Sequence, residues 1–397
     1  MPNASAPPPC RPLAARWRWG GLAILATWSS LAAGATLHVG PGGLATIAEA
    51  ARLAQDGDTV EIAAGTYRGE VAVWTQRRLT LRAAGGPAEL VADGAIAEGK
   101  AIWVLRNGEF TVEDIVFRGA RAAAGNGAGI RFERGRLLVR RCGFFDNEMG
   151  ILTSNDPGAQ LDIEDSEFAH APRGAERPLK HLLYVGHIDR VRIRGSHFHD
   201  GFVAHLVKSR ARESDLRYNR VWDGEGGSAS YEMDFPNGGV VTLIGNLVEQ
   251  SAGTQNLALI SFGAEGSAWP EHRLTFAHNT LVNDAGPESH FLRLWPDKVT
   301  PAPLRIVNNL LVGPGQMDGL AGEISEGNRQ GSLRNPDRGD FRPRRGTAPV
   351  RPPPPDLVPE AEFHPPLGTR PLRPPRAWLP GAIQSSPTAL RTGKALP

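Results

Sequence analysis

The sequence predicts an all-β solenoid, in which short strands form coils that stack on one another. Eight apolar segments share one pattern, a small or polar residue followed by two or three apolar residues. They lie at residues 114–117, 142–145, 166–168, 196–198, 219–221, 246–248, 279–282 and 309–312. Their leading residues are between 23 and 33 residues apart. Fixed short strands joined by loops of variable length indicate stacked β coils, because helical repeats need longer periodic segments.

The first 35 residues have the organisation of an export signal. Arg11, Arg16 and Arg18 precede an apolar run at residues 20–33, and Ala-Gly-Ala at residues 33–35 forms a small-x-small cleavage site. A membrane anchor is the alternative, but the run is too short to span with margin. We expect this signal peptide to be removed, leaving a periplasmic or secreted protein without a stable membrane span.

A capping helix is expected near the start of the mature chain. A short strand is predicted at residues 36–39, and in residues 44–54 the apolar Ile47, Ala50 and Ala54 lie on one helical stripe. A helix at this point would cover the open end of the stack, which otherwise exposes backbone groups and apolar side chains.

The charge balance gives no case for nucleic acid as a partner. The 397 residues carry a net charge of only +2, and aromatic residues make up 7%. A basic face with interleaved aromatic rings, which nucleic-acid binding needs, is not evident. The sequence has two cysteines, and only Cys142 lies beyond the export signal, so the mature chain has no internal disulfide.

The solenoid is predicted to occupy residues 36–315, followed by a Pro/Arg-rich C-terminal segment at residues 316–397. Residues 341–380 contain 13 of the 33 prolines, and a central strand cannot hold these. The segment is expected to be partly docked or disordered, with Phe363 and Trp378 among its apolar anchors.

Four asparagines begin successive repeats: Asn219, Asn246, Asn279 and Asn309. Amides stacked at one turn hydrogen-bond up and down a ladder of parallel strands. We therefore expect a structural role for these residues and do not place them in a site.

The coil spacing, the capping helix, the amide ladder and the opening Asp-Gly-Asp-Thr-Val at 56–60 resemble the pectate-lyase-like superfamily. The resemblance covers roughly residues 36–315 and implies an all-β, right-handed parallel β-helix with an N-terminal capping helix. That superfamily includes lyases, hydrolases, epimerases and non-catalytic surface proteins, so the likeness alone does not choose a function.

Lys208-Ser209 followed by Asn219 also resembles the Lys-Ser…Asn pattern of the alginate-lyase and chondroitinase-B group. In that group the lysine is the base, and Arg-His-Gly follows one coil later. Here Tyr-Glu-Met-Asp at residues 231–234 takes that place, so the group's catalytic arginine has no counterpart at this position.

Strand alternation predicts one outward column formed by Tyr184, Lys208, Asp234 and Ser261. Adjacent strands are about 4.8 Å apart, so a phenol, an ammonium and a carboxylate would lie within reach of each other. Glu232 lies two residues before Asp234 and is expected on the same face.

Such a group suits chemistry on an acidic sugar. Removing the proton α to a uronate carboxylate needs a base and a positive charge that stabilises the enolate-like state. Lys208 is the candidate base, provided that nearby arginines favour its neutral form. Arg210 or Arg212 would hold the carboxylate, and Tyr184 would protonate the leaving oxygen.

Glu232 and Asp234 leave further possibilities open. They could bind calcium, the one candidate ion, since it prefers oxygen ligands. They could instead form the acid/base pair of a glycoside hydrolase, or belong to a charge ladder on a non-catalytic polysaccharide-binding solenoid. The function expected first is an exported carbohydrate-active protein that acts on a uronate-containing polysaccharide by lyase or epimerase chemistry.

Overall fold

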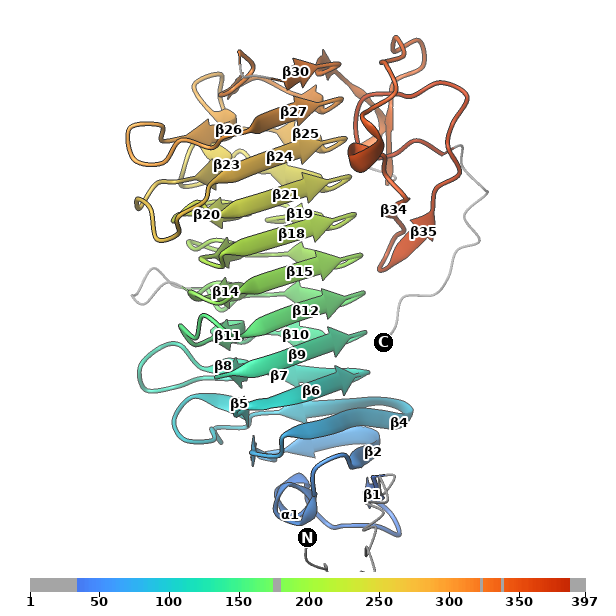
Figure 1. Ribbon diagram of the computed structural model, residues 1–397. Helices are drawn as coiled ribbons and strands as arrows, with labels where there is room; N and C mark the ends of the chain where they lie inside the picture. The colour runs from blue at the N-terminus through green and yellow to red at the C-terminus, as the bar shows by residue number, and fades with distance from the viewer. Residues whose placement is uncertain (1–33, 174–179, 322–323, 337–338, 386–397) are drawn as a thin grey trace, which may run out of the picture. The chain divides into compact units, whose positions relative to one another are not determined.

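A computed structural model describes residues 34–173, 180–321, 324–336 and 339–385. In these residues the chain winds into a parallel β-helix whose strands lie one above the other (Figure 1). The predicted signal peptide at residues 1–35 lies, except for its last two residues, outside the described part.

Successive coils add strands to three parallel stacks. The first stack contains β3 (Ala72–Trp74), β5 (Ala101–Leu105), β8 (Ala128–Phe132), β11 (Met149–Thr153), β14 (Leu183–Val185), β17 (Val207–Ser209), β20 (Met233–Phe235), β23 (Ala258–Phe262), β26 (His290–Leu294) and β29 (Gln316–Met317). The second contains β1 (Thr36–Val39), β2 (Thr59–Arg68), β4 (Arg78–Val91), β6 (Gly108–Glu113), β9 (Gly135–Arg140), β12 (Gln160–Glu164), β15 (Arg190–Arg194), β18 (Glu213–Arg217), β21 (Val240–Ile244), β24 (Arg273–Ala277), β27 (Leu304–Val307) and β30 (Ile324–Glu326). The third begins with the C-terminal part of β4 and continues through β7 (Ile115–Arg118), β10 (Gly143–Phe145), β13 (Glu167–Ala169), β16 (His197–His199), β19 (Arg220–Trp222), β22 (Leu247–Gln250), β25 (Thr280–Asn283), β28 (Leu310–Val312) and β31 (Arg329–Gly331).

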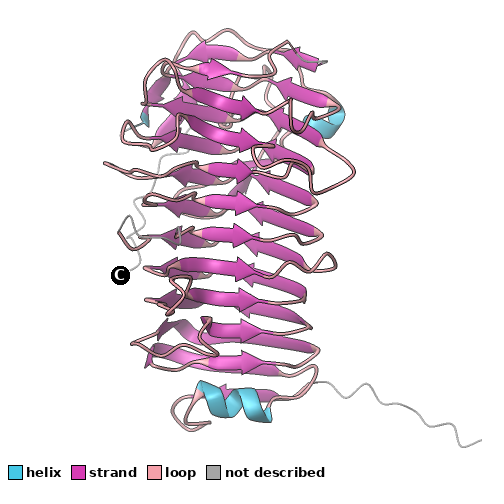
Figure 2. Ribbon diagram, turned by 90° about the vertical axis from the view of Figure 1, so that its left-hand side faces the viewer, coloured by secondary structure: helices cyan, strands magenta, loops and turns pink. Residues whose placement is uncertain are grey.

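The predicted capping helix is α1 (Ile47–Leu53), which lies beneath the first coil (Figure 2). Its N-cap is Thr46, whose hydroxyl accepts the backbone N–H of Glu49 at 3.0 Å. At the other end, the Gln76 side chain donates to the carbonyl of Ala54 at 2.9 Å, which satisfies a helix-terminal acceptor. Within the described residues no helix is long and apolar enough to cross a membrane.

The interior is filled by side chains that repeat from coil to coil. Phe117, Phe144, Phe168 and Phe198 occupy equivalent positions in β7, β10, β13 and β16. Their rings stack with successive centroid distances of 5.1, 4.5 and 4.6 Å. Parallel strands in constant register bring like residues into contact, so one flat ring can lie on the next without a gap.

The asparagine ladder forms as predicted. The Asn246 side chain donates to the carbonyl of Leu216 at 2.9 Å and to Oδ1 of Asn279 at 3.0 Å. Its own Oδ1 accepts from the backbone and the side chain of Asn219. Asn309 and Asn328 continue the same pattern. Each amide therefore satisfies the buried backbone of the coils above and below it.

The solenoid continues past the predicted boundary at residue 315. Strand β30 pairs with β27, and β31 pairs with β28. Asn328 extends the amide ladder between these two strands. The sequence pattern ends earlier because β30 and β31 are largely exposed and polar, so they lack the apolar signature of the inner coils.

The C-terminal segment packs along the outside of the solenoid over its described residues. It contains β32 (Leu333–Asn335), β33 (Asp340–Pro343), the 3-10 helix η2 (Pro355–Leu357), β34 (Ala361–Phe363) and β35 (Thr369–Pro371). Phe341 and Phe363 share an apolar cluster with Leu247 and Leu310 of the third stack. The backbone N–H of Glu360 donates to the Tyr218 hydroxyl at 2.9 Å. The anchor Trp378 is also buried.

Replacing Asn246 with alanine should lower the free energy of unfolding by roughly 1–3 kcal/mol, because buried amide and carbonyl groups lose their partners. Urea unfolding measures this, and any activity of the folded fraction should stay the same. Asn335→Ala, at an exposed strand position, is the matched control and should change stability by no more than about 0.5 kcal/mol. Unchanged stability for Asn246→Ala would contradict the structural role of the ladder.

Candidate functional site

The register of the first stack aligns the predicted outward column. Tyr184 of β14 is paired with Lys208 of β17, Lys208 with Asp234 of β20, and Asp234 with Ser261 of β23. The sequence placed these side chains correctly because alternation within each strand and a constant register between strands determine the column.

Lys208 is held between two carboxylates. Its Nζ lies 3.3 Å from Oδ2 of Asp234 and 2.9 Å from Oε1 of Glu265. Although Lys208 faces outward from the strand, only 7% of the residue is exposed, because the loop after β23 brings Glu265 over it. The two negative charges stabilise its ammonium form in this buried position.

Arg210 completes the group on the side of Tyr184. Its Nε donates to the Tyr184 hydroxyl at 2.9 Å, and a terminal nitrogen lies 2.6 Å from Oε2 of Glu265. The other terminal nitrogen donates to the side-chain oxygen of Asn237. Partial burial alone would raise the pKa of Glu265, but hydrogen bonds from Lys208 and Arg210 outweigh it and lower that pKa. One carboxylate is thus shared by both cations.

A stack of buried rings lies next to Asp234. His181, His205 and Tyr231 follow one another in successive coils, with ring centroids 4.9 Å apart at each step. Nδ1 of His181 accepts the backbone N–H of His205 at 3.1 Å, and Nε2 of His205 lies 3.4 Å from Asp234. Burial lowers the pKa of His181 to about 3, with a further contribution from Lys208. Burial raises the pKa of Asp234, which Lys208 partly offsets.

The comparisons with known proteins bear on the fold. No protein-family model matches the sequence, and no curated protein matches it either. Among solved structures, the pectate lyase Pel9A has a TM-score of 0.53 at 11% identity, over 75% of this chain and 82% of that chain. A variant of the PL6 family alginate lyase AlyGC has a TM-score of 0.37 at 15% identity, over 79% of this chain and 56% of that chain. The fold is that of a pectate-lyase-like parallel β-helix.

Arg212 does not join the group around Lys208. Its guanidinium contacts Asp189 at 2.7 Å, and 40% of its side chain is exposed. The predicted position assumed that alternation continues beyond β17. The chain turns after Ser209, however, and Arg212 immediately precedes β18, so the side-chain parity of the first stack no longer applies.

Glu232 does not lie on the outward face with Asp234, and that expectation is wrong. It is fully buried and immediately precedes β20, in the position that Leu206 occupies one coil earlier. Burial raises the pKa of Glu232 well above its ordinary value, and Asp223 adds to the effect.

The predicted calcium pair of Glu232 and Asp234 therefore does not fit the observed geometry. The charges that act on Glu232 are those of Asp223 and Glu249, whereas Lys208 and Glu265 act on Asp234. A calcium site needs several oxygens that converge on one point. The same separation removes the geometric basis for these two carboxylates as the acid/base pair of a hydrolase.

Sequence reasoning missed the residues that the loops contribute. Glu265 and Trp269 lie between β23 and β24, and the indole N–H of Trp269 donates to the carbonyl of Arg210 at 3.0 Å. No periodic signal marks such a contact, because the loop reaches back across coils. Arg293 could have been found, since its strand pairs with Ser261 and continues the outward column.

Stability should fall with pH because His181 is buried in its neutral form. Its pKa is about 3 in the folded chain and about 6.5 when unfolded. Between these values the unfolded state binds the extra proton, so stability is lost as pH falls below about 6.5. Each such group contributes up to roughly 1.4 kcal/mol per pH unit.

Urea unfolding at several pH values tests this. His181→Asn keeps an acceptor but does not titrate, so its stability should depend less steeply on pH than that of the wild type. His38→Asn is the control, since the His38 side chain is 66% exposed and should leave the slope unchanged. An equal slope in the wild type and His181→Asn would contradict the assignment.

Proposed function

We propose that this protein acts on a uronate-containing polysaccharide by lyase or epimerase chemistry at Tyr184, Lys208 and Arg210. The observation that carries the proposal is the way these residues hold Glu265. One oxygen of that carboxylate is 2.9 Å from Lys208 and the other is 2.6 Å from Arg210. The carboxylate of a uronate has the same charge and shape, and it would take the place of Glu265 between the two cations.

The charge of the site suits the removal of a proton next to a carboxylate. Without Glu265, Lys208 and Arg210 bring two positive charges against the single carboxylate of Asp234. When the α proton leaves the sugar, negative charge spreads onto the substrate carboxylate. Cations that are already in position and largely shielded from water stabilise that charge more strongly than water does.

Tyr184 is the group that we assign to proton transfer. Its hydroxyl accepts a hydrogen bond from Arg210 at 2.9 Å, and its strand adjoins that of Lys208. Lys208 lies 3.3 Å from Asp234, which stabilises the ammonium, so its proposed role is to bind and stabilise the substrate carboxylate. Lys208 as the base is the alternative that the first experiment separates.

A non-catalytic role in polysaccharide binding is the second candidate. It is favoured by Glu265 itself, because this residue already occupies the cationic pair and could leave only the energy for binding. Export to the periplasm or the exterior, where such polymers are met, belongs to the same proposal. It rests on the export signal at residues 1–35.

Tyr184→Phe should lower turnover by roughly 10²–10⁴-fold, because it removes a proton-transfer group, and should leave binding largely intact. Elimination is followed by the ultraviolet absorbance of the unsaturated uronate, and epimerisation by deuterium incorporation from solvent. Lys208→Arg keeps the positive charge and should retain more activity than Tyr184→Phe. Arg212→Gln, outside the group, is the control and should behave like the wild type.

The reverse order, with Tyr184→Phe active and Lys208→Arg inactive, would make Lys208 the base. Binding of oligouronates without elimination or exchange in the wild type would favour the non-catalytic candidate. Lys208→Ala is less informative, because it leaves Asp234, which is 2% exposed, as an unpaired buried charge and destabilises the fold. Circular dichroism should show that each compared variant is folded.

Glu265→Gln should bind oligouronates several-fold more tightly than the wild type, because the neutral amide competes less strongly for Lys208 and Arg210. Calorimetric titration at low and raised salt measures this. Glu271→Gln is a matched control on the same loop, where the side chain is 52% exposed and pairs with Arg273. Equal or weaker binding by Glu265→Gln would show that Glu265 is not a stand-in for the substrate.

A further inference from the structure

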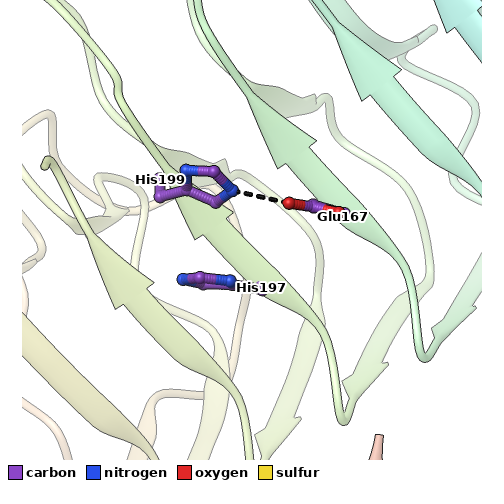
Figure 3. A group of neighbouring side chains, drawn as sticks. All are labelled: Glu167, His197 and His199. Atoms are coloured by element: carbon purple, nitrogen blue, oxygen red, sulfur yellow. Dashed lines mark hydrogen bonds and ion pairs between the residues drawn. The ribbon is translucent and has the colours of Figure 1, made fainter. Parts of the chain in front are cut away.

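A second group of chemically active side chains lies on the third stack, away from the Lys208 group on the first stack. Glu167 comes from β13, and His197 and His199 come from β16. One potential ligand atom from each residue lies within 4.8 Å of the other two. Figure 3 shows the three side chains together, with Glu167 bonded to His199.

The β-helix backbone brings these residues together. His197 and His199 are two residues apart on one strand, so both side chains leave the same face. Glu167 is paired with His197 in the neighbouring strand, and parallel strands are about 4.8 Å apart. Two imidazoles and a carboxylate thus converge from a rigid element of the scaffold, without the involvement of a long loop.

His199 is oriented by a carboxylate on its far side. Its Nδ1 lies 2.6 Å from Oδ2 of Asp200, and its Nε2 lies 2.8 Å from Oε1 of Glu167. A histidine that binds a metal through one ring nitrogen ordinarily donates the other N–H to a carboxylate, which fixes the ring. Asp200 is placed to fix His199 with Nε2 as the ligand.

His197 has a buried polar atom without a partner. Its Nε2 is buried and has no hydrogen-bond partner among the described residues. Its ring centroid is 4.3 Å from that of His199 and 6.1 Å from that of Phe363 in the C-terminal segment. Buried nitrogen and oxygen atoms are nearly always paired, so this imidazole is in a setting that a ligand would satisfy.

We propose that Glu167, His197 and His199 bind a divalent transition-metal ion of the zinc class, with Asp200 as the positioning residue. Two imidazoles and one carboxylate match the ligand preference of zinc and its neighbours, whereas calcium and magnesium prefer oxygen alone. The ion takes the place of the proton that His199 and Glu167 share, and water completes its coordination. Solvent reaches the group through Glu167, whose side chain is 33% exposed.

Arg220 is the cation nearest to this group in the strand register, since it is paired with His197. Its guanidinium carbon lies 5.1 Å from the ring centroid of Trp222 and 4.8 Å from that of Phe341. These rings stabilise the charge of Arg220. Glu167 and Asp200 supply the two negative charges that balance a divalent ion, so the group as a whole tolerates one.

Zinc titration of the full-length chain, after treatment with a chelator, tests the proposal by calorimetry. We expect one zinc ion per chain, and a visible absorption spectrum when cobalt replaces zinc. His197→Gln and His199→Gln should each abolish the tight site, and Asp200→Asn should weaken it by roughly 10–100-fold. His38→Gln is the matched control, because His38 and Glu61 form a similar pair at 3.1 Å in the first coils and should leave binding unchanged.

The alternative is a protonated His199 that joins Glu167 and Asp200 without any ion. Absence of zinc and cobalt binding by the wild type would establish that alternative and overturn the proposal, and this measurement needs no variant. Binding that persists unchanged in folded His197→Gln and His199→Gln would also overturn it, because the metal would then lie elsewhere. Both readouts are independent of any action on polysaccharides.

Discussion

The constant register between parallel coils is the constraint on which the rest of this structure depends. Each coil places its residues directly over their counterparts, so a chemical property at one position recurs through the stack or meets its complement there. In the interior this produces the stacked rings of Phe117, Phe144, Phe168 and Phe198. At the turn it produces the amide ladder, in which Asn246 bonds to both neighbouring coils. These groups cannot be satisfied if the register slips, so the interior and the ladder together hold every strand in place.

The same constraint makes polar substitution in a column costly. A charge that replaces an apolar residue lies about 4.8 Å from its neighbours on both sides and loses water when a loop covers it. Lys208 and Asp234 are in this situation, since both are almost completely buried. Their attraction offsets part of the desolvation cost, but a buried ion pair is often no more stable than apolar residues of the same size. Arg210 and Glu265 add further contacts, so the group is compatible with the fold without being needed for it. This is the physical reason for assigning it a function.

The sequence predicts what periodicity controls and misses what loops decide. Strand alternation placed Tyr184, Lys208 and Asp234 in one column, and the repeat spacing predicted the β-helix itself. Glu232 and Arg212 were misplaced because both lie just outside a strand, where the two-residue period stops. Glu265 was missed because it reaches Lys208 from a loop 57 residues further along the chain, and no local pattern encodes that return. The exposure of Lys208 was wrong for the same reason, because the loop that covers it could not be placed.

The two polar groups show how a repetitive fold can carry unrelated chemistry on different faces. On the first stack, charges from successive coils form a site that holds a carboxylate. On the third stack, His197 and His199 use the two-residue period of a single strand, and Glu167 adds the neighbouring coil. Both arrangements use spacings that the backbone provides anyway, so neither requires a change in the fold. A parallel β-helix therefore constrains where side chains lie but not what they do. Function has to be argued from the residues themselves, here a carboxylate shared by two cations and an imidazole pair oriented by Asp200.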